Sequence, residues 1–255
     1  MAVALVPWGS SLTERVLGLV LVTMGVAALV STRLVPLPIT TGSVHATLSL
    51  GLLALLGVSQ APSYRARPIP RPGLGDWMFA GAFVSAAAWL LFAYFGRSTE
   101  QTLAGLFFTG WDNQAHFTTF ANAYETGSMT WPTPDGSIAW NQWYPALHTT
   151  LWAMGQLAFQ ATGQLTRPEL LAPFVTWSGL SAALAFAAMA WVAGDLASRL
   201  VAKGESASPL RSWARCLAVL GVLGFLLLGS SSRLFNYGFT NFIMGVAVIS
   251  VASYL

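Results

Sequence analysis

Residues 170–194 read LLAPFVTWSGLSAALAFAAMAWVAG, a stretch without a single charged side chain. A helix needs roughly 20 apolar residues to cross the hydrocarbon core of a bilayer, and only helices and closed barrels satisfy their backbone hydrogen bonds there. Because the apolar residues of this stretch are continuous rather than alternating, we expect a transmembrane helix and not a barrel strand.

The rest of the chain repeats this pattern. Hydrophobic residues make up 55% of the sequence and charged residues only 8%, against about 25% charged in a typical soluble domain. Between the charges we predict five further spans, at about 16–32, 41–60, 77–96, 213–232 and 236–255. The sequence therefore predicts an all-α, polytopic transmembrane protein with a single membrane domain over residues 1–255. Since the chain stops at Leu255 inside an apolar run, we expect it to be the N-terminal part of a longer protein; the alternative is a natural end at the membrane interface.

Several classes of protein do not fit this sequence. The single cysteine, Cys216, excludes an internal disulfide framework and a cysteine metal cluster. The basic balance, +3 with a pI of about 9.4, comes from residues in short loops between spans. This is an orientation signal, so the expected partner is the lipid bilayer and not nucleic acid. The motifs of Walker-type ATPases, His-Glu-x-x-His proteases and serine hydrolases do not occur.

Arginine and lysine in short loops predict the orientation of the spans. The loop 61–75 carries three arginines, and the loop 195–215 carries four basic residues against two acids, so both should be cytoplasmic. The loop 97–145 has four acids and one arginine and should be extracytoplasmic. The N-terminus is then cytoplasmic. One lysine among twelve basic residues, with abundant Ala and Gly, indicates a GC-rich bacterial genome and hence the cytoplasmic membrane of a bacterium.

Residues 145–163 allow two interpretations. A full span here would place the basic loop 195–215 outside, whereas an interfacial or re-entrant helix on the outer face keeps both basic loops inside. Gln156, Gln160 and Gln164 recur every four residues and form a polar stripe on one helical face. We therefore favour the interfacial or re-entrant helix.

The loop before this segment gathers polar groups that the rest of the chain avoids. Gly110 and Gly127 frame a predicted helix at about 113–126 with Asp112 as its N-cap, and His116 lies four residues later on the same face. A second helix should begin at Tyr144-Pro145, with His148 one turn in. If Asp112, His116 and His148 act together, their side chains should lie within several ångströms of one another.

Each of these residues also has an ordinary explanation. Asp112 alone is most often a helix cap, a lone histidine beside a membrane is most often interfacial, and Trp140 and Trp143 fit an aromatic belt at the membrane surface. It is the occurrence of an acid, two histidines and several amides in one loop that indicates a functional site.

Residues 111–148 also resemble a known group of proteins. Three motifs occur in order: Trp-Asp at 111–112 with His116, Glu-Thr-Gly at 125–127, and Tyr-Pro-Ala at 144–146 with His148. They resemble an uncharacterised family of polytopic actinobacterial membrane proteins, which is similar to the GT-C superfamily of glycosyltransferases that use polyprenyl-phosphate-linked sugars. The chain departs from the GT-C pattern because two further spans come before the span that leads into the acidic loop, and because GT-C enzymes are usually much longer.

The resemblance implies a transferase that moves a sugar from a polyprenyl-phosphate donor to a cell-envelope acceptor on the outer face. Asp112 would be the general base, and His116 and His148 would orient it, hold the phosphate or bind a divalent metal ion. The chemistry of sugar transfer suggests the substrate-binding candidates Tyr144, Trp140 and Trp143, with the tryptophans as sugar-stacking groups. Arg233, at the predicted outer end of a span, is a phosphate candidate, and its ordinary explanation is an interface anchor. The alternatives are a transporter or flippase component for a lipid-linked or polar substrate, and a non-catalytic membrane subunit.

Overall fold

The computed structural model of the chain describes residues 10–29, 69–108, 110–126, 147–160, 163–201 and 209–255. Within these ranges the chain forms helices and no strand, which confirms the all-α expectation for this part of the protein. The expected span at 41–60 lies outside the described residues.

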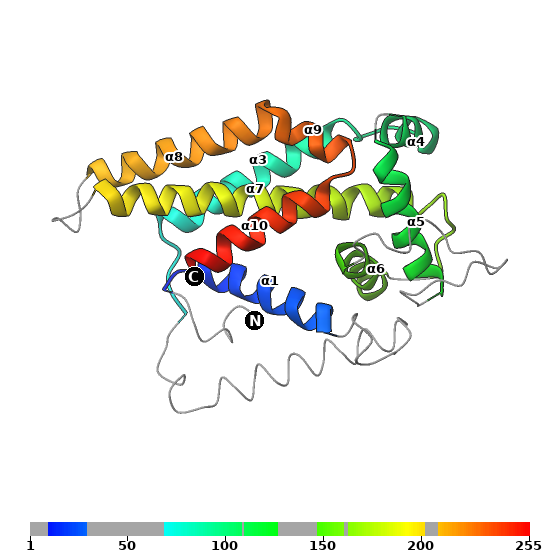
Figure 1. Cartoon of the computed structure of the whole chain (residues 1–255), viewed down its shortest axis with the longest axis horizontal. Coiled ribbons are helices and arrows are strands. Elements are labelled where there is room, and N and C mark those ends of the chain that lie inside the picture. Colours follow the sequence, from blue (N-terminus) through cyan, green and yellow to red (C-terminus); the bar gives the residue numbers. More distant parts are fainter. Residues whose placement is uncertain (1–9, 30–68, 109, 127–146, 161–162, 202–208) are drawn as a thin grey trace.

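The helices fall into a long bundle and a group at one of its ends (Figure 1). The bundle contains α1 (Leu12–Leu29), α3 (Leu74–Phe92), α7 (Leu171–Val201), α8 (Pro209–Leu228) and α10 (Thr240–Tyr254). The end group contains α4 (Thr99–Phe107), α5 (Trp111–Thr126), α6 (Leu147–Phe159) and the short α9 (Ser230–Asn236).

Helix α7 is the centre of the bundle. It has 31 residues and is therefore about 46 Å long, more than the roughly 30 Å of a bilayer core. In its most apolar window 56% of the residues are buried, against 17% in α3 and in α8. Helices α3, α8 and α10 all pack on α7, whereas α3 and α8 turn most of their own apolar surface outward.

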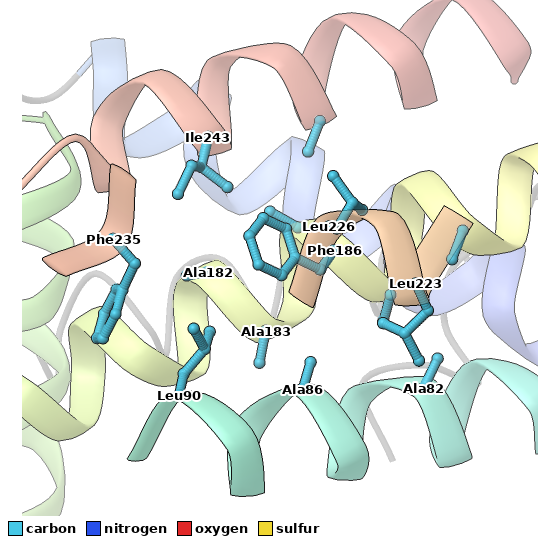
Figure 2. Close-up of a cluster of buried hydrophobic side chains, with 14 of the residues drawn as sticks. Ala82, Ala86, Leu90, Ala182, Ala183, Phe186, Leu223, Leu226, Phe235 and Ile243 are labelled. Atoms are coloured by element: carbon cyan, nitrogen blue, oxygen red, sulfur yellow. The ribbon is translucent and has the colours of Figure 1, made fainter. Parts of the chain in front are cut away.

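Small residues let these helices pack closely. The core between α3 and α7 is built from Ala82, Ala86, Ala182 and Ala183, with Phe186 beside them (Figure 2). Two glycines of α7 mark the tightest approaches, since a Cβ on Gly179 would lie 2.4 Å from Leu91 and one on Gly194 would lie 2.6 Å from Val219. A larger side chain at either position would have to displace the Leu91 or Val219 side chain, or the helix that carries it.

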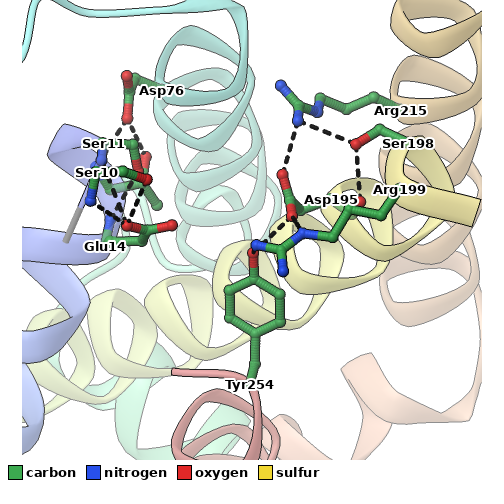
Figure 3. A network of polar contacts seen from close by, with 10 residues as sticks. Ser10, Ser11, Glu14, Asp76, Asp195, Ser198, Arg199, Arg215 and Tyr254 are labelled. Carbon is green, nitrogen blue, oxygen red and sulfur yellow. Dashed lines mark hydrogen bonds and ion pairs between the residues drawn. The ribbon is translucent and has the colours of Figure 1, made fainter. Parts of the chain in front are cut away.

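A polar network closes the end of the bundle where α7 finishes (Figure 3). The carboxylate of Asp195 accepts hydrogen bonds from Arg199 Nε at 2.6 Å, Arg215 Nη2 at 2.7 Å and Tyr254 Oη at 2.5 Å. Arg215 also donates to Ser198. One carboxylate thus ties α7, α8 and α10 together, and the ion pairs neutralise charges that an apolar bundle could not otherwise hold.

A second contact at the same end joins the first two described helices. The backbone nitrogen and the hydroxyl of Thr13 both donate to Asp76 Oδ1, each at 2.8 Å. A Cβ on Gly75 would lie 3.2 Å from Arg215 Nη1, so the start of α3 lies beside the start of α8. The flanks of both basic loops, 61–75 and 195–215, therefore meet at one end of the bundle.

Helices α4, α5 and α6 lie at the opposite end. In Figure 1, α7 runs along the page while α4 and α6 are seen nearly end-on, so these two cross its direction. Helix α6 has 13 residues, about 20 Å, which is too short to cross a bilayer core. Two glutamines of the expected polar stripe contact neighbouring helices. Gln160, just after α6, accepts a hydrogen bond from the Tyr124 hydroxyl of α5, and Gln156 accepts one from Trp177 Nε1 of α7.

Several expected boundaries were wrong. Helix α7 continues past the predicted end at 194 to Val201, because Asp195 and Arg199 form an (i, i+4) pair that favours the helix. The spans expected at 213–232 and 236–255 are α8 and α10 with α9 between them, because Gly229 and the turn at Gly238 interrupt the helix. Helix α4 was not expected inside the loop 97–145.

The membrane expectation is supported in a coarser form. Three of the described helices, α3, α7 and α8, are long and apolar enough to cross a membrane by length and composition. The expected spans at 16–32 and 236–255 correspond to the helices α1 and α10, of which α10 is a shorter apolar helix.

Replacing Asp195 tests whether its network holds the bundle together. We expect Asp195→Asn to lower the free energy of unfolding by about 1–3 kcal/mol, the usual cost of losing charged hydrogen bonds. Thermal unfolding of the detergent-solubilised protein measures the loss. Glu100→Gln, an exposed position with the same change in charge, should cost less than about 0.5 kcal/mol. Equal stability of the two variants would show that the network is dispensable.

Candidate functional site

Buried polar side chains gather where α5 packs on α6. On α5 the side chains of Asp112, Asn113, His116 and Thr119 are all less than 9% exposed, and Asp112 itself is 6% exposed. The (i, i+4) spacing of Asp112 and His116 places both on one face, as expected from the sequence. An acid and an imidazole this deeply buried are uncommon and need specific neighbours.

Helix α6 completes the cluster from the other side. His148, Thr149 and Thr150 in its first turn are at most 4% exposed. The rings of His116 and His148 meet edge to face, with centroids 4.7 Å apart and an interplanar angle of 72°. The predicted convergence of the two histidines is confirmed, although they are 32 positions apart in sequence.

An aromatic wall encloses the histidine pair. His148 contacts the Trp152 ring edge to face at 4.9 Å, and Trp152 packs on Phe174 of α7 at 5.7 Å. Phe117 and Phe120 pack on the same Phe174. These rings attach α5 and α6 to the start of α7, and they keep the environment of the imidazoles apolar.

Burial determines the protonation of both histidines. The pKa of His116 is lowered mainly by burial, which the nearby Asp112 carboxylate partly opposes. Burial, and then the neighbouring His116, lower the pKa of His148 to about 3. Both imidazoles are therefore neutral at pH 7, so they bring no positive charge to a phosphate. Within the described residues His148 Nε2 has no hydrogen-bond partner.

The position of Asp112 differs from the expectation. Helix α5 begins at Trp111, one residue before the predicted cap, so Asp112 lies inside the first turn and is not the N-cap. The Asn113 backbone nitrogen donates to Gly110 O at 2.9 Å, which tightens this first turn. A carboxylate here is stabilised by the positive end of the helix dipole.

The structure does not assemble the metal site that the sequence suggested. Among the described residues, no group of three His, Cys, Asp or Glu side chains is arranged to hold a metal ion. Asp112 lies near His116, and the His116 ring contacts His148, but the three do not form such a group. The tyrosine and tryptophan candidates, Tyr144, Trp140 and Trp143, lie outside the described residues.

Arg233 lies on the short helix α9. Its side chain is exposed in the last turn of α9. A groove of about 530 Å³ opens between α3 and α9, lined by Ser85, Trp89, Phe92, Ser232 and Asn236. Trp89 and Phe92 expose 53% and 82% of their surface, so the groove has an aromatic, apolar side and a polar side.

Sequence reasoning missed Asn113, although it directly follows Asp112. Its buried amide Nδ2 donates to Leu106 O at 3.1 Å and to Asn236 O at 2.9 Å, which joins the ends of α4 and α9 to the start of α5. Helix α4 itself had a readable signal. Ser98 and Gln101 form a capping box, in which each side chain accepts from the other's backbone nitrogen.

Comparison with family models, with curated proteins and with solved structures finds no match to the chain. The inferences that follow therefore depend on the residues and their geometry.

The histidine burial predicts a dependence of stability on pH. A histidine with a depressed pKa binds its proton more readily in the unfolded chain, so stability falls as pH drops below about 6.5, by up to about 1.4 kcal/mol per pH unit for each group. For His148 this loss should continue toward pH 3. We expect His148→Leu to lose less stability between pH 6.5 and 4 than the wild type, as measured by thermal unfolding.

The exposed Gln114 of α5 provides the control. Gln114→Leu adds the same apolar side chain without removing a titrating group, so it should keep the pH slope of the wild type. An unchanged slope in His148→Leu would contradict the assignment of a buried, neutral His148.

Proposed function

We propose that this chain is a multi-pass protein of a bacterial cytoplasmic membrane. In this proposal the end of the bundle with Asp195 faces the cytoplasm, together with the N-terminus, and the end with α4, α5 and α6 is extracytoplasmic. Two observations support it: the apolar outer faces of α3 and α8, and the meeting of both basic loop flanks at one end. The short, crosswise α6 then lies along the outer membrane surface.

We propose further that the protein is a glycosyltransferase of the GT-C kind, which moves a sugar from a polyprenyl-phosphate donor to a cell-envelope acceptor. The observation that carries this proposal is the burial of Asp112, His116 and His148 in one cluster at the end of an apolar bundle. Ionisable groups in such a place are costly to bury, and chemistry at the membrane surface is a reason to keep them.

The chemistry assigns a role to each group. Asp112 takes the proton of the acceptor hydroxyl while the acceptor oxygen bonds to the anomeric carbon and the polyprenyl phosphate leaves with the electrons of the broken bond. His116, neutral and electrostatically coupled to Asp112, orients the carboxylate, and His148 supports the His116 ring. The aromatic wall around the pair keeps water out, which strengthens these interactions.

The leaving phosphate needs a cation that the neutral histidines do not supply. Arg233 is the proposed source of that charge, because it is exposed on α9 and directly follows Ser232, which lines the groove between α3 and α9. The exposed aromatic side of this groove, Trp89 and Phe92, suits an apolar chain that arrives from the bilayer.

Replacing Asp112 tests the catalytic role. Asp112→Asn keeps the shape of the side chain and removes the base, so sugar transfer should fall by about 100-fold or more. The first readout is complementation of the cell-envelope or growth phenotype of a gene deletion, followed by transfer from a defined lipid-linked donor. The variant should insert into the membrane normally, because the lost helix-dipole interaction amounts to only about 0.3–1 kcal/mol.

Glu100→Gln is the matched control, since Glu100 occupies the first turn of α4 as Asp112 occupies that of α5, but is exposed. It loses the same dipole interaction without touching the cluster and should complement fully. Full complementation by Asp112→Asn would end the catalytic assignment and leave a structural role for the cluster.

A further inference from the structure

The turn between α9 and α10 lies in close contact with the backbone of Asp112, the proposed general base. Gly238, in this turn, has a φ of +93°, and a Cβ there would lie 2.6 Å from the backbone nitrogen of Asn113 and 2.9 Å from Asp112 Cβ. No side chain fits at this position unless the first turn of α5 moves. The contact joins residues that are 126 positions apart in sequence.

A second glycine makes the same contact from the other side. A Cβ on Gly110, just before α5, would lie 2.3 Å from Asn236 O and 2.9 Å from the Tyr237 carbonyl carbon. The entry to α5 and the exit from α9 therefore meet backbone to backbone, with a glycine on each side. Contacts of this kind leave little freedom for either segment.

Hydrogen bonds from Asn113 stabilise the contact between the entry to α5 and the exit from α9. Its side chain is 3% exposed, and Nδ2 donates to the last turns of both α4 and α9, at Leu106 O and Asn236 O. Buried amides of this kind are costly to leave unpaired, so both acceptors hold the first turn of α5 in place. Asp112 is the residue immediately before Asn113.

From this geometry we propose that Gly238, Gly110 and Asn113 are positioning residues that fix the Asp112 carboxylate relative to His116. The inference rests on the proposed function for its consequence, because a general base must stand within hydrogen-bond reach of the proton it takes. The α9–α10 turn thus becomes part of the site, although its own side chains carry no chemistry there.

The placement of Asp112 can be measured without any substrate. The Asp112 charge raises the pKa of His116 against the effect of burial, so Asp112→Asn should lower that pKa further. Among the described residues, the titratable groups at His116 are Asp112 and His148. The His116 titration followed by NMR of imidazole-labelled protein in detergent therefore reports how closely the carboxylate stands to the ring.

We expect Gly238→Ala to weaken this coupling. In the Gly238→Ala background, the drop in the His116 pKa caused by Asp112→Asn should shrink to about half or less, because Coulomb coupling weakens with distance and with access of water. In the Gly96→Ala background the drop should stay as in the wild type. Gly96 also has a positive φ, +73°, but a Cβ there meets nothing within 4 Å, so this control carries the backbone strain without the contact.

An equal drop in the His116 pKa in the wild-type, Gly238→Ala and Gly96→Ala backgrounds would overturn the proposal. If Gly238→Ala does not accumulate in a folded form, Asn113→Leu provides the same comparison, since it keeps the side-chain size but removes both hydrogen bonds; an unchanged drop there also overturns it. The titration is separate from the proposed function. Weakened coupling together with full complementation by Asp112→Asn would keep the positioning role and reject the transferase.

Discussion

Close packing against α7 is the constraint on which the other helices depend. The faces of α7 toward α3 and α8 carry alanines and glycines, so the neighbouring helices approach until Leu91 and Val219 touch its backbone at Gly179 and Gly194. Helix α7 is also longer than a bilayer core is thick. Polar groups gather near its two ends, with Asp195 and Arg199 on α7 itself at one end and the buried side chains of α5 and α6 at the other.

These two ends use polar groups differently. At one end, Asp195 is saturated by two arginines and a tyrosine, so its charge is neutralised within the bundle. At the other end, Asp112 lies near His116, whose ring contacts His148, and burial keeps both imidazoles neutral. The first arrangement ties helices together and leaves no group available for chemistry. The second holds a carboxylate and neutral imidazoles in a buried cluster, and it is the reason for assigning function to this end.

The sequence predicted the features that depend on local pattern. Apolar runs predicted the helices now seen as α3, α7, α8 and α10, and the spacing of Asp112 and His116 predicted their shared face. What it could not predict depends on contacts between distant segments. Helix α5 begins at Trp111, two residues earlier than predicted, where its entry fits against the α9–α10 turn, and no local signal indicates that Gly238 would lie there. The capping box at Ser98 was a local signal for α4 that went unused.

The central claim is that the cluster of Asp112 and the two histidines lies on the extracytoplasmic face of the membrane, with α6 along that face. Labelling of intact cells with a membrane-impermeant maleimide tests this directly, using single cysteines at Ser137→Cys and Ser206→Cys in a Cys216→Ser background. The account predicts labelling at position 137 from outside, and labelling at position 206 only after the membrane is made permeable. Labelling of position 206 from outside would contradict it, because the segment of α6 would then have to cross the membrane.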